Sequence, residues 1–140
     1  MKILLAVDGS PYTQKMLAYL TSHQEMLGES RQYTIISVQS LLPPRARAVV
    51  GKETVDQYYA EEFAKIVQPV TEFLSSRGVQ AHVITKVGHI GDSIIEAAVE
   101  GKFDLIMMGT HGHGALGRLV MGSVSSQVLA GCDVPVLLIR

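Results

Sequence analysis

The chain has 140 residues, of which 47% are hydrophobic and 18% are charged, and its formal net charge is −1. This length suggests one domain spanning residues 1–140, and the apolar content excludes a mainly disordered chain. The balanced charge excludes a basic field for nucleic acid, and the apolar runs fall far short of the ~20 residues of a membrane-spanning helix. The N-terminal residues lack a secretory pattern and Cys132 is the single cysteine, so we expect a cytoplasmic protein without an internal disulfide.

Segments with strand and helix patterns alternate along the chain. The apolar run at residues 2–7 predicts a buried strand. Ser10 then suits the N-cap and Pro11 the first position of a helix that stops at Gly28. Later strands are predicted at residues 33–38, 79–87, 103–108 and 134–139. Later helices are predicted at residues 53–77, at 91–101 and from a Ser123 cap, with Pro69 expected to bend the first of these or leave one carbonyl unpaired.

The segment from Leu41 to Gly51 fits neither period, and the pair Pro43-Pro44 within it predicts a loop. This region carries three basic residues, and two interpretations stay open: a solvated loop, or a lid that meets phosphates or a partner. The basic residues are Arg45, Arg47 and Lys52. In the helix that follows, Tyr58 and Tyr59 are expected to pack on the sheet rather than stack on a base.

The alternation predicts an α/β fold, with a single doubly wound domain, a five-stranded parallel sheet and helices on both faces. Ligands of such sheets bind beyond the carboxyl ends of the strands, where the winding direction switches. The candidate functional segments are therefore the turns after the strands, at residues 8–10, 38–51, 87–92 and 109–123.

The densest functional pattern is the glycine-rich stretch between Gly109 and Ser123, directly after a strand and before a helix. Glycines there allow the backbone to approach a phosphate, although an ordinary connector is the alternative. Residues 112–117 satisfy G-x-G-x-x-G, but the acidic residue that a dinucleotide site needs at the end of the next strand is absent. A Walker-type lysine is also absent, and Arg118 is the cation of this stretch.

The spacing of Gly109, Gly112, Gly122 and Ser123 reads G-x2-G-x9-G-[ST] and resembles the nucleotide-binding pattern of the universal stress protein family. The resemblance covers the whole chain. The matching segments are residues 3–10, 87–88, 104–112, 122–125 and 132–140.

This resemblance implies strand order 3-2-1-4-5, a homodimer through the last strand from Val134 to Ile139, and membership of the ATP-binding branch. It implies that one set of residues surrounds adenine, ribose and phosphates: Val7, Asp8, Val38, Met108, Gly109, His111, Gly112, Gly122, Ser123, Val124 and Ser125. Asp8 can accept from ribose hydroxyls or the adenine amino group, and Ser123 and Ser125 can donate to phosphate oxygens. A β-carbon at Gly122 is expected to enter the phosphate path.

The leading hypothesis is an ATP or adenine-nucleotide-binding regulatory protein of the stress response, in which binding rather than fast turnover is the main event. One alternative is a slow ATPase or nucleotidyl-transfer enzyme that uses the same pocket. Another is a structural or interaction dimer that binds no nucleotide. The pair His111 and His113 lacks a third metal ligand, so any Mg²⁺ or Mn²⁺ is expected to be carried by the phosphates. Asp8 has a second interpretation as a structural Asx-turn residue.

Overall fold

The computed structural model describes residues 1–113 and 121–140, and within them five parallel strands pair in the order β3-β2-β1-β4-β5. Both the α/β class and the predicted strand order are confirmed. The strands are β1 (Lys2–Ala6), β2 (Gln32–Gln39), β3 (His82–Val87), β4 (Leu105–Gly109) and β5 (Val136–Ile139). In the centre of the sheet, Leu5 pairs with Ile35 of β2 on one side and with Met107 of β4 on the other.

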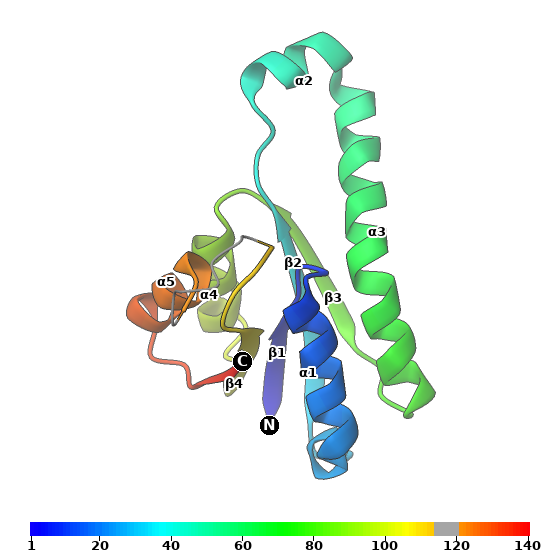
Figure 1. Ribbon diagram of the computed structural model, residues 1–140, viewed down its shortest axis with the longest axis vertical. Helices are drawn as coiled ribbons and strands as arrows, with labels where there is room; N and C mark the ends of the chain where they lie inside the picture. The colour runs from blue at the N-terminus through cyan, green and yellow to red at the C-terminus, as the bar shows by residue number, and fades with distance from the viewer. Residues whose placement is uncertain (114–120) are drawn as a thin grey trace.

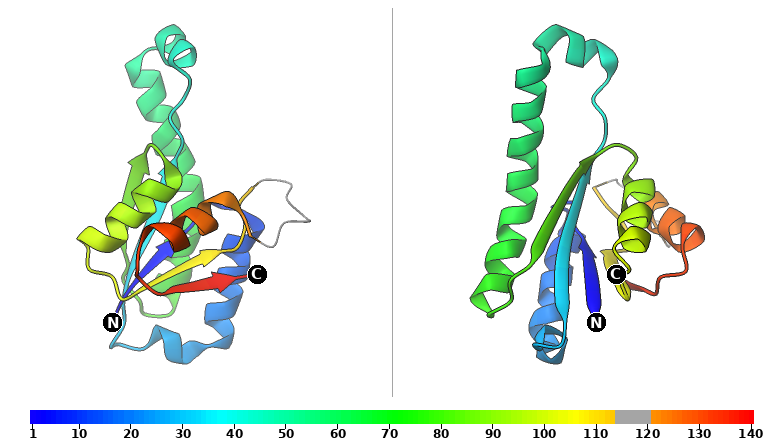
Figure 2. Two further views of the ribbon diagram at one scale, coloured as in Figure 1. Left: turned by 90° about the vertical axis from the view of Figure 1, so that its left-hand side faces the viewer. Right: turned by 180° about the vertical axis from the view of Figure 1, so that it is seen from behind.

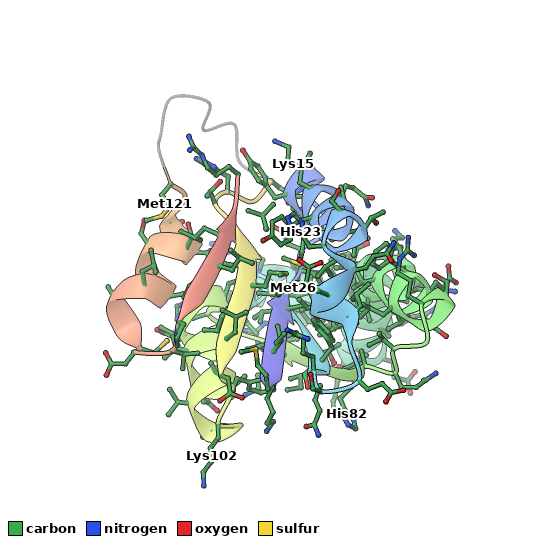
Figure 3. All side chains as sticks on the ribbon, turned by 90° about the horizontal axis from the view of Figure 1, so that it is seen from below. Lys15, His23, Met26, His82, Lys102 and Met121 are labelled. Atoms are coloured by element: carbon green, nitrogen blue, oxygen red, sulfur yellow. The ribbon has the colours of Figure 1, made fainter. Side chains whose placement is uncertain are left out.

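Helices cover both faces of this sheet (Figure 1). They are α1 (Pro11–Ser22), the short 3-10 helix η1 (Gln24–Leu27), α2 (Pro44–Val50), α3 (Lys52–Ser76), α4 (Ile90–Glu100) and α5 (Ser123–Gly131). The view from behind in Figure 2 shows α1 and α3 on one side of the strands and α4 and α5 on the other. Figure 3, seen from the end opposite α2, shows the same two layers around the strands.

Alternation along the strands divides the buried side chains between these two layers. Leu5, Ile35 and Met107 pack with α1 and α3 in one apolar cluster. Leu4, Ile36 and Ile106 pack with α4 and α5 in the other. A parallel sheet covered on both faces needs this nearly continuous apolar character, which made β1 and β4 predictable.

The first turn of α1 forms as predicted. The Ser10 side chain caps the helix by accepting the Tyr12 N–H at 3.3 Å, and Pro11 occupies the first turn. The helix ends earlier than its apolar period suggests, at Ser22, and η1 continues the chain to Gly28.

The segment Leu41–Gly51 is not a loop throughout, because α2 occupies Pro44–Val50. Pro43 and Pro44 stand at the N-cap and in the first turn, where the missing N–H groups would have no helical partner. Gly51, at φ 82°, then ends α2. Proline therefore marks a helix start here rather than excluding a helix.

Other predicted boundaries shift by a few residues. β3 begins at His82 rather than Val79, and β5 begins at Val136 rather than Val134. Helix α3 continues through Pro69 to Ser76. Pro69 is exposed, so the carbonyl that it leaves without an N–H donor faces the solvent side of the helix.

Helix α2 and the first part of α3 project beyond the carboxyl edge of the sheet (Figure 1). No residue of α2 is buried. Among the described residues, no helix combines the length and the apolar character needed to cross a membrane.

Candidate functional site

A cavity of about 700 Å³ opens at the carboxyl edge of the sheet. Here the chain passes from β1 to β2 on one side, while β4 flanks β1 on the other, so this is the switch point of the winding. The pairing of β1 with β2 ends at Ala6 and Ile36, and the Val7 N–H donates to Ile36 O at 3.0 Å. Beyond this bond β2 continues to Gln39 with β3 as its partner.

Every residue that the sequence assigns to the nucleotide lines this one cavity. The predicted residues are Val7, Asp8, Val38, Met108, Gly109, His111, Gly112, Gly122, Ser123, Val124 and Ser125. Chain topology thus brings the ends of β1, β2 and β4 together with the start of α5. The last four residues of the G-x-G-x-x-G match at 112–117, together with Arg118, lie outside the described residues.

One apolar part of the cavity lies on the α4 and α5 face of the sheet. Val38 and Met108 are buried there beside Ile94 of α4. Alternate residues of a strand direct their main-chain groups to the same side, so the N–H and C=O of Val38 point in the same direction as those of Ile36, toward β1. Because β1 has already ended at this level, these two groups face open space. The result is an apolar slot with a hydrogen-bond donor and an acceptor at its edge.

Asp8 has a structural role and also faces the cavity. Its Oδ1 accepts the Ser10 N–H at 2.9 Å and the Thr13 hydroxyl at 3.3 Å, so the Asx-turn interpretation holds for this oxygen. Its Oδ2 lies opposite Gly112, where a β-carbon would come within 2.9 Å of it. Within the part of the chain that the structure describes, the hydrogen bonds of the Asp8 carboxylate use Oδ1, so Oδ2 can accept from a ligand.

Two histidines, His111 and His113, flank Gly112 in the chain. The Nε2 of His113 is 2.6 Å from Asp8 O and links this segment to the first turn of the chain. The Nδ1 of His111 is 3.0 Å from the Thr110 hydroxyl, and its ring lies 5.4 Å from the Tyr12 ring. Within residues 1–113 and 121–140, no three histidine, cysteine or acidic side chains come together as a metal site.

The start of α5 is closed against the end of β4 by the main chain. The Gly122 N–H donates to Thr110 O at 2.6 Å. The hydroxyl of Ser125, 2% exposed, donates to the same oxygen at 2.8 Å, with Gly122 O also within reach at 3.0 Å. The N-cap is Gly122 rather than the predicted Ser123, which is the exposed first residue of the helix.

This closure corrects the expected effect of a side chain at Gly122. A β-carbon there would lie 3.1 Å from Thr110 O and 3.3 Å from the His111 Cα, so it meets the protein backbone rather than the open cavity. The first N–H that bonds within the helix is that of Ser126, which donates to Gly122 O. The N–H groups of the preceding turn, from Ser123 to Ser125, are those that a helix start leaves for other acceptors.

Gly109 has a packing role that the sequence did not indicate. A β-carbon there would lie 2.5 Å from the Tyr12 Cβ, so glycine allows α1 to approach the end of β4. Tyr12 and Thr13 both line the cavity although neither belongs to the glycine pattern. The proximity of the two segments depends on tertiary packing.

A second wall of the cavity comes from α3 and from the connector between β2 and α2. The connector contributes residues 40–43, and α3 contributes Tyr58, Glu62 and Ile66. Tyr58, expected to pack on the sheet, instead remains 44% exposed. The sequence shows that these three α3 residues are spaced by four and share one helix face. It does not show which part of the chain that face contacts. Among the described lining residues, Asp8 and Glu62 carry formal charge, and both are acidic.

Comparison with known proteins places the chain among relatives of this fold. A model of the universal stress protein family matches residues 1–140. Universal stress protein MJ0531 of Methanocaldococcus jannaschii is 32% identical over 140 residues, covering 99% of this chain and 81% of that protein. Universal stress protein Slr1230 of Synechocystis is 29% identical over 139 residues, covering 99% of this chain, and the chain spans 42% of that relative's length.

Solved structures show the same architecture. UspA from Lactobacillus plantarum has a TM-score of 0.81 at 21% identity, over 100% of this chain and 97% of that one. A universal stress protein from Archaeoglobus fulgidus in complex with dAMP has a TM-score of 0.65 at 20% identity, over 100% and 98%. A family protein from Arabidopsis thaliana with AMP bound has a TM-score of 0.63 at 18% identity, over 99% and 90%. At these identities the structures show a shared fold. The family match over residues 1–140 and the relative at 32% identity show that the chain belongs to the universal stress protein family.

Proposed function

We propose that the chain binds an adenine nucleotide in the cavity at the carboxyl edge and acts as a nucleotide-dependent regulatory module of the ATP-binding branch. The observation that carries the proposal is the convergence of the whole predicted residue set on one cavity beside a helix start. Relatives of the same fold that were solved with AMP and with dAMP support it.

The phosphates would bind at the first turn of α5. The N–H groups of Ser123, Val124 and Ser125 lie at the positive end of the helix dipole, which favours an anion. The exposed Ser123 hydroxyl can add a donor, while the Ser125 hydroxyl holds the turn closed through Thr110 O. The main chain then supplies most of the contacts to phosphate.

The adenosine part would lie toward the centre of the sheet. The adenine ring would enter the apolar slot between Val38 and Met108, and the Val38 main-chain donor and acceptor would read its edge. Asp8 Oδ2 would accept from a ribose hydroxyl, because Asp8 lines the cavity and its hydrogen bonds within the turn use Oδ1. The two halves of the ligand thus use different chemistry.

Binding rather than fast turnover is the main event of this proposal, and the charges around the cavity bear on how a triphosphate would enter. Its charged side chains, within the part of the chain that the structure describes, are the carboxylates Asp8 and Glu62. These repel a triphosphate unless a cation accompanies it, so ATP would enter with Mg²⁺ or Mn²⁺ on its phosphates. Slow ATP hydrolysis or nucleotidyl transfer in the same cavity remains the alternative to test.

A homodimer through β5 is the second part of the proposal. β5 stands at the edge of the sheet, and its apolar residues Val136, Leu137 and Leu138 are partly exposed. An apolar edge strand is prone to uncontrolled pairing, and a second copy of the chain would cover it. A cytoplasmic location is also part of the proposal.

The test is calorimetric titration of the purified chain with AMP, ATP plus Mg²⁺, and GMP, together with mass spectrometry of any nucleotide released on denaturation. Binding of the adenine nucleotides with weaker binding of GMP is expected. Absence of both heat and co-purified nucleotide would contradict the proposal and favour a structural dimer. Single-turnover hydrolysis approaching the ~10 per second of a typical enzyme would favour the enzyme alternative.

A further inference from the structure

Tyr59 joins the two parts of the second wall, α3 and the connector, through its hydroxyl group. This oxygen accepts the Leu42 N–H at 2.8 Å and donates to Ser40 O at 3.1 Å. Tyr59 belongs to α3, whereas Ser40 and Leu42 belong to the connector between β2 and α2. Tyr59 is 7% exposed and both hydrogen bonds are partly buried, so competition from water is reduced.

The segment that Tyr59 holds is part of the cavity lining. Residues 40–43 contribute to the wall, and on the adjacent face of α3 so do Tyr58, Glu62 and Ile66. The connector leaves the sheet edge and rises to α2 before the chain returns along α3 (Figure 1). Tyr59 therefore bridges the outgoing and returning segments beside the cavity.

Little else in the described structure fixes the connector. Ser40 and Leu41 are exposed, and α2, which follows, has no buried residue. The ring of Tyr59 is held independently of its hydroxyl, because it stacks with Phe63 at 6.4 Å and meets the Tyr58 ring edge-on at 5.7 Å. The ring can thus stay in place when the hydroxyl is removed.

We propose that Tyr59 is a positioning residue that holds the connector Ser40–Pro43 in the conformation that encloses the base end of the ligand. It does so by pairing one donor and one acceptor of the connector main chain. This inference rests on the proposed nucleotide binding and identifies the α3 residue that holds the connector in place.

The test compares Tyr59→Phe with Tyr33→Phe. Tyr33 also donates its hydroxyl to a main-chain carbonyl, that of Met26, and is also buried, but Met26 lies outside the cavity lining, whereas Ser40 and Leu42 belong to it. Both variants lose the same chemical group. Tyr59→Phe is expected to bind AMP about tenfold more weakly, chiefly through faster dissociation, because two hydrogen bonds of the wall are lost. Tyr33→Phe should bind AMP as the unchanged protein does while losing comparable stability.

A second measurement uses the unchanged protein. The Leu42 amide is bonded to Tyr59, so its hydrogen exchange reports whether the connector is closed. AMP should slow this exchange, and Tyr59→Phe should speed it without affecting amides of β1. If Tyr59→Phe does not fold, the effect of AMP on Leu42 exchange decides the matter.

The outcomes separate the two proposals. If the unchanged protein binds AMP but Tyr59→Phe binds it equally well, or if AMP leaves Leu42 exchange unchanged, the positioning role is wrong and nucleotide binding stands. If the unchanged protein binds no adenine nucleotide, both proposals are wrong. Equal losses of affinity in Tyr59→Phe and Tyr33→Phe would indicate a general loss of stability and would also overturn the positioning role.

Discussion

At the α5 side of the cavity the main chain closes on itself, whereas at the α3 side a side chain holds the main chain in place. The Gly122 N–H reaches Thr110 O directly, across a gap that a β-carbon would fill. The connector at residues 40–42 instead depends on the Tyr59 hydroxyl. The α5 side therefore requires glycine at position 122, whereas the connector requires a hydroxyl group supplied by α3.

Gly122→Val should have the largest effect, because it opens the α5 side. The β-carbon alone approaches Thr110 O to 3.1 Å, and the branched side chain adds two methyl groups. We expect a loss of unfolding free energy of about 1–3 kcal/mol from overpacking and at least ~100-fold weaker AMP binding. Urea unfolding and calorimetry measure the two effects.

Gly122→Ala should give an intermediate effect. Its single methyl group requires a shift of a few tenths of an ångström, so its affinity for AMP should fall between those of the valine variant and the unchanged protein. Unaltered affinity in both variants would show that the closure between Gly122 and Thr110 does not shape the ligand site.

Asp8→Asn should have the next largest effect, because it removes the negative charge of a side chain that lines the cavity. Asparagine keeps an oxygen for the Ser10 N–H and so preserves the turn, but it replaces the carboxylate opposite Gly112 by a neutral amide. Hydrogen bonds to charged groups contribute about 1.5–3 kcal/mol, so AMP should bind ~10- to ~100-fold more weakly. Unfolding free energy should change by less than about 0.5 kcal/mol.

Asp8→Ala provides the comparison for this variant. It removes the turn acceptor as well, so it should lower both affinity and stability. If Asp8→Asn bound AMP with unchanged affinity, the role of Asp8 would be limited to the turn that Oδ1 stabilises. The proposed contact of Oδ2 with the ligand would then be wrong.

Ser123→Ala and Ser125→Ala should separate ligand contact from closure within a single helix turn. Ser125 is buried and bonded to Thr110 O, so its loss should lower unfolding free energy by about 1 kcal/mol. Ser123 is exposed, so its loss should leave stability within about 0.5 kcal/mol and weaken AMP binding severalfold. Equal stability losses in the two variants would contradict this division.

The two sides also differ in how far the sequence predicts them. The end of β4 and the start of α5 were predictable, because the glycine pattern marks positions near each other in the sequence where a side chain would be crowded. The α3 wall was not, because Tyr58 and Glu62 acquire their role only when a helix from another part of the chain packs beside the connector. Helix α2 was missed for a local reason, since its two prolines suit a helix start as well as a loop.

Roles proved harder to predict than positions. Gly109 lies at the cavity as expected, yet its lack of a side chain is explained by the approach of Tyr12. Ser125 lines the cavity too, yet its hydroxyl is engaged by Thr110 O. A spacing pattern identifies residues that must be small or polar, and the three-dimensional contacts decide what each one touches.

The smallest effect is expected far from both walls, at Tyr33. Burial raises the pKa of the Tyr33 phenol above its ordinary value of about 10, and nearby Arg31 partly opposes the shift. Between the unfolded and folded pKa values, the unfolded chain releases the phenol proton while the folded chain keeps it. The unfolded state then binds fewer protons, so the contribution of Tyr33 is constant below pH ~10 and stability falls as pH rises above it.

The difference between the unchanged protein and Tyr33→Phe isolates this group from the other alkaline titrations. Urea unfolding from about pH 8 to about pH 11 should show a constant difference at the lower end and a narrowing one above pH ~10, with a slope of at most ~1.4 kcal/mol per pH unit. A difference independent of pH would mean that the Tyr33 pKa is not raised. AMP affinity should be the same in both proteins throughout, because neither wall of the cavity includes Tyr33.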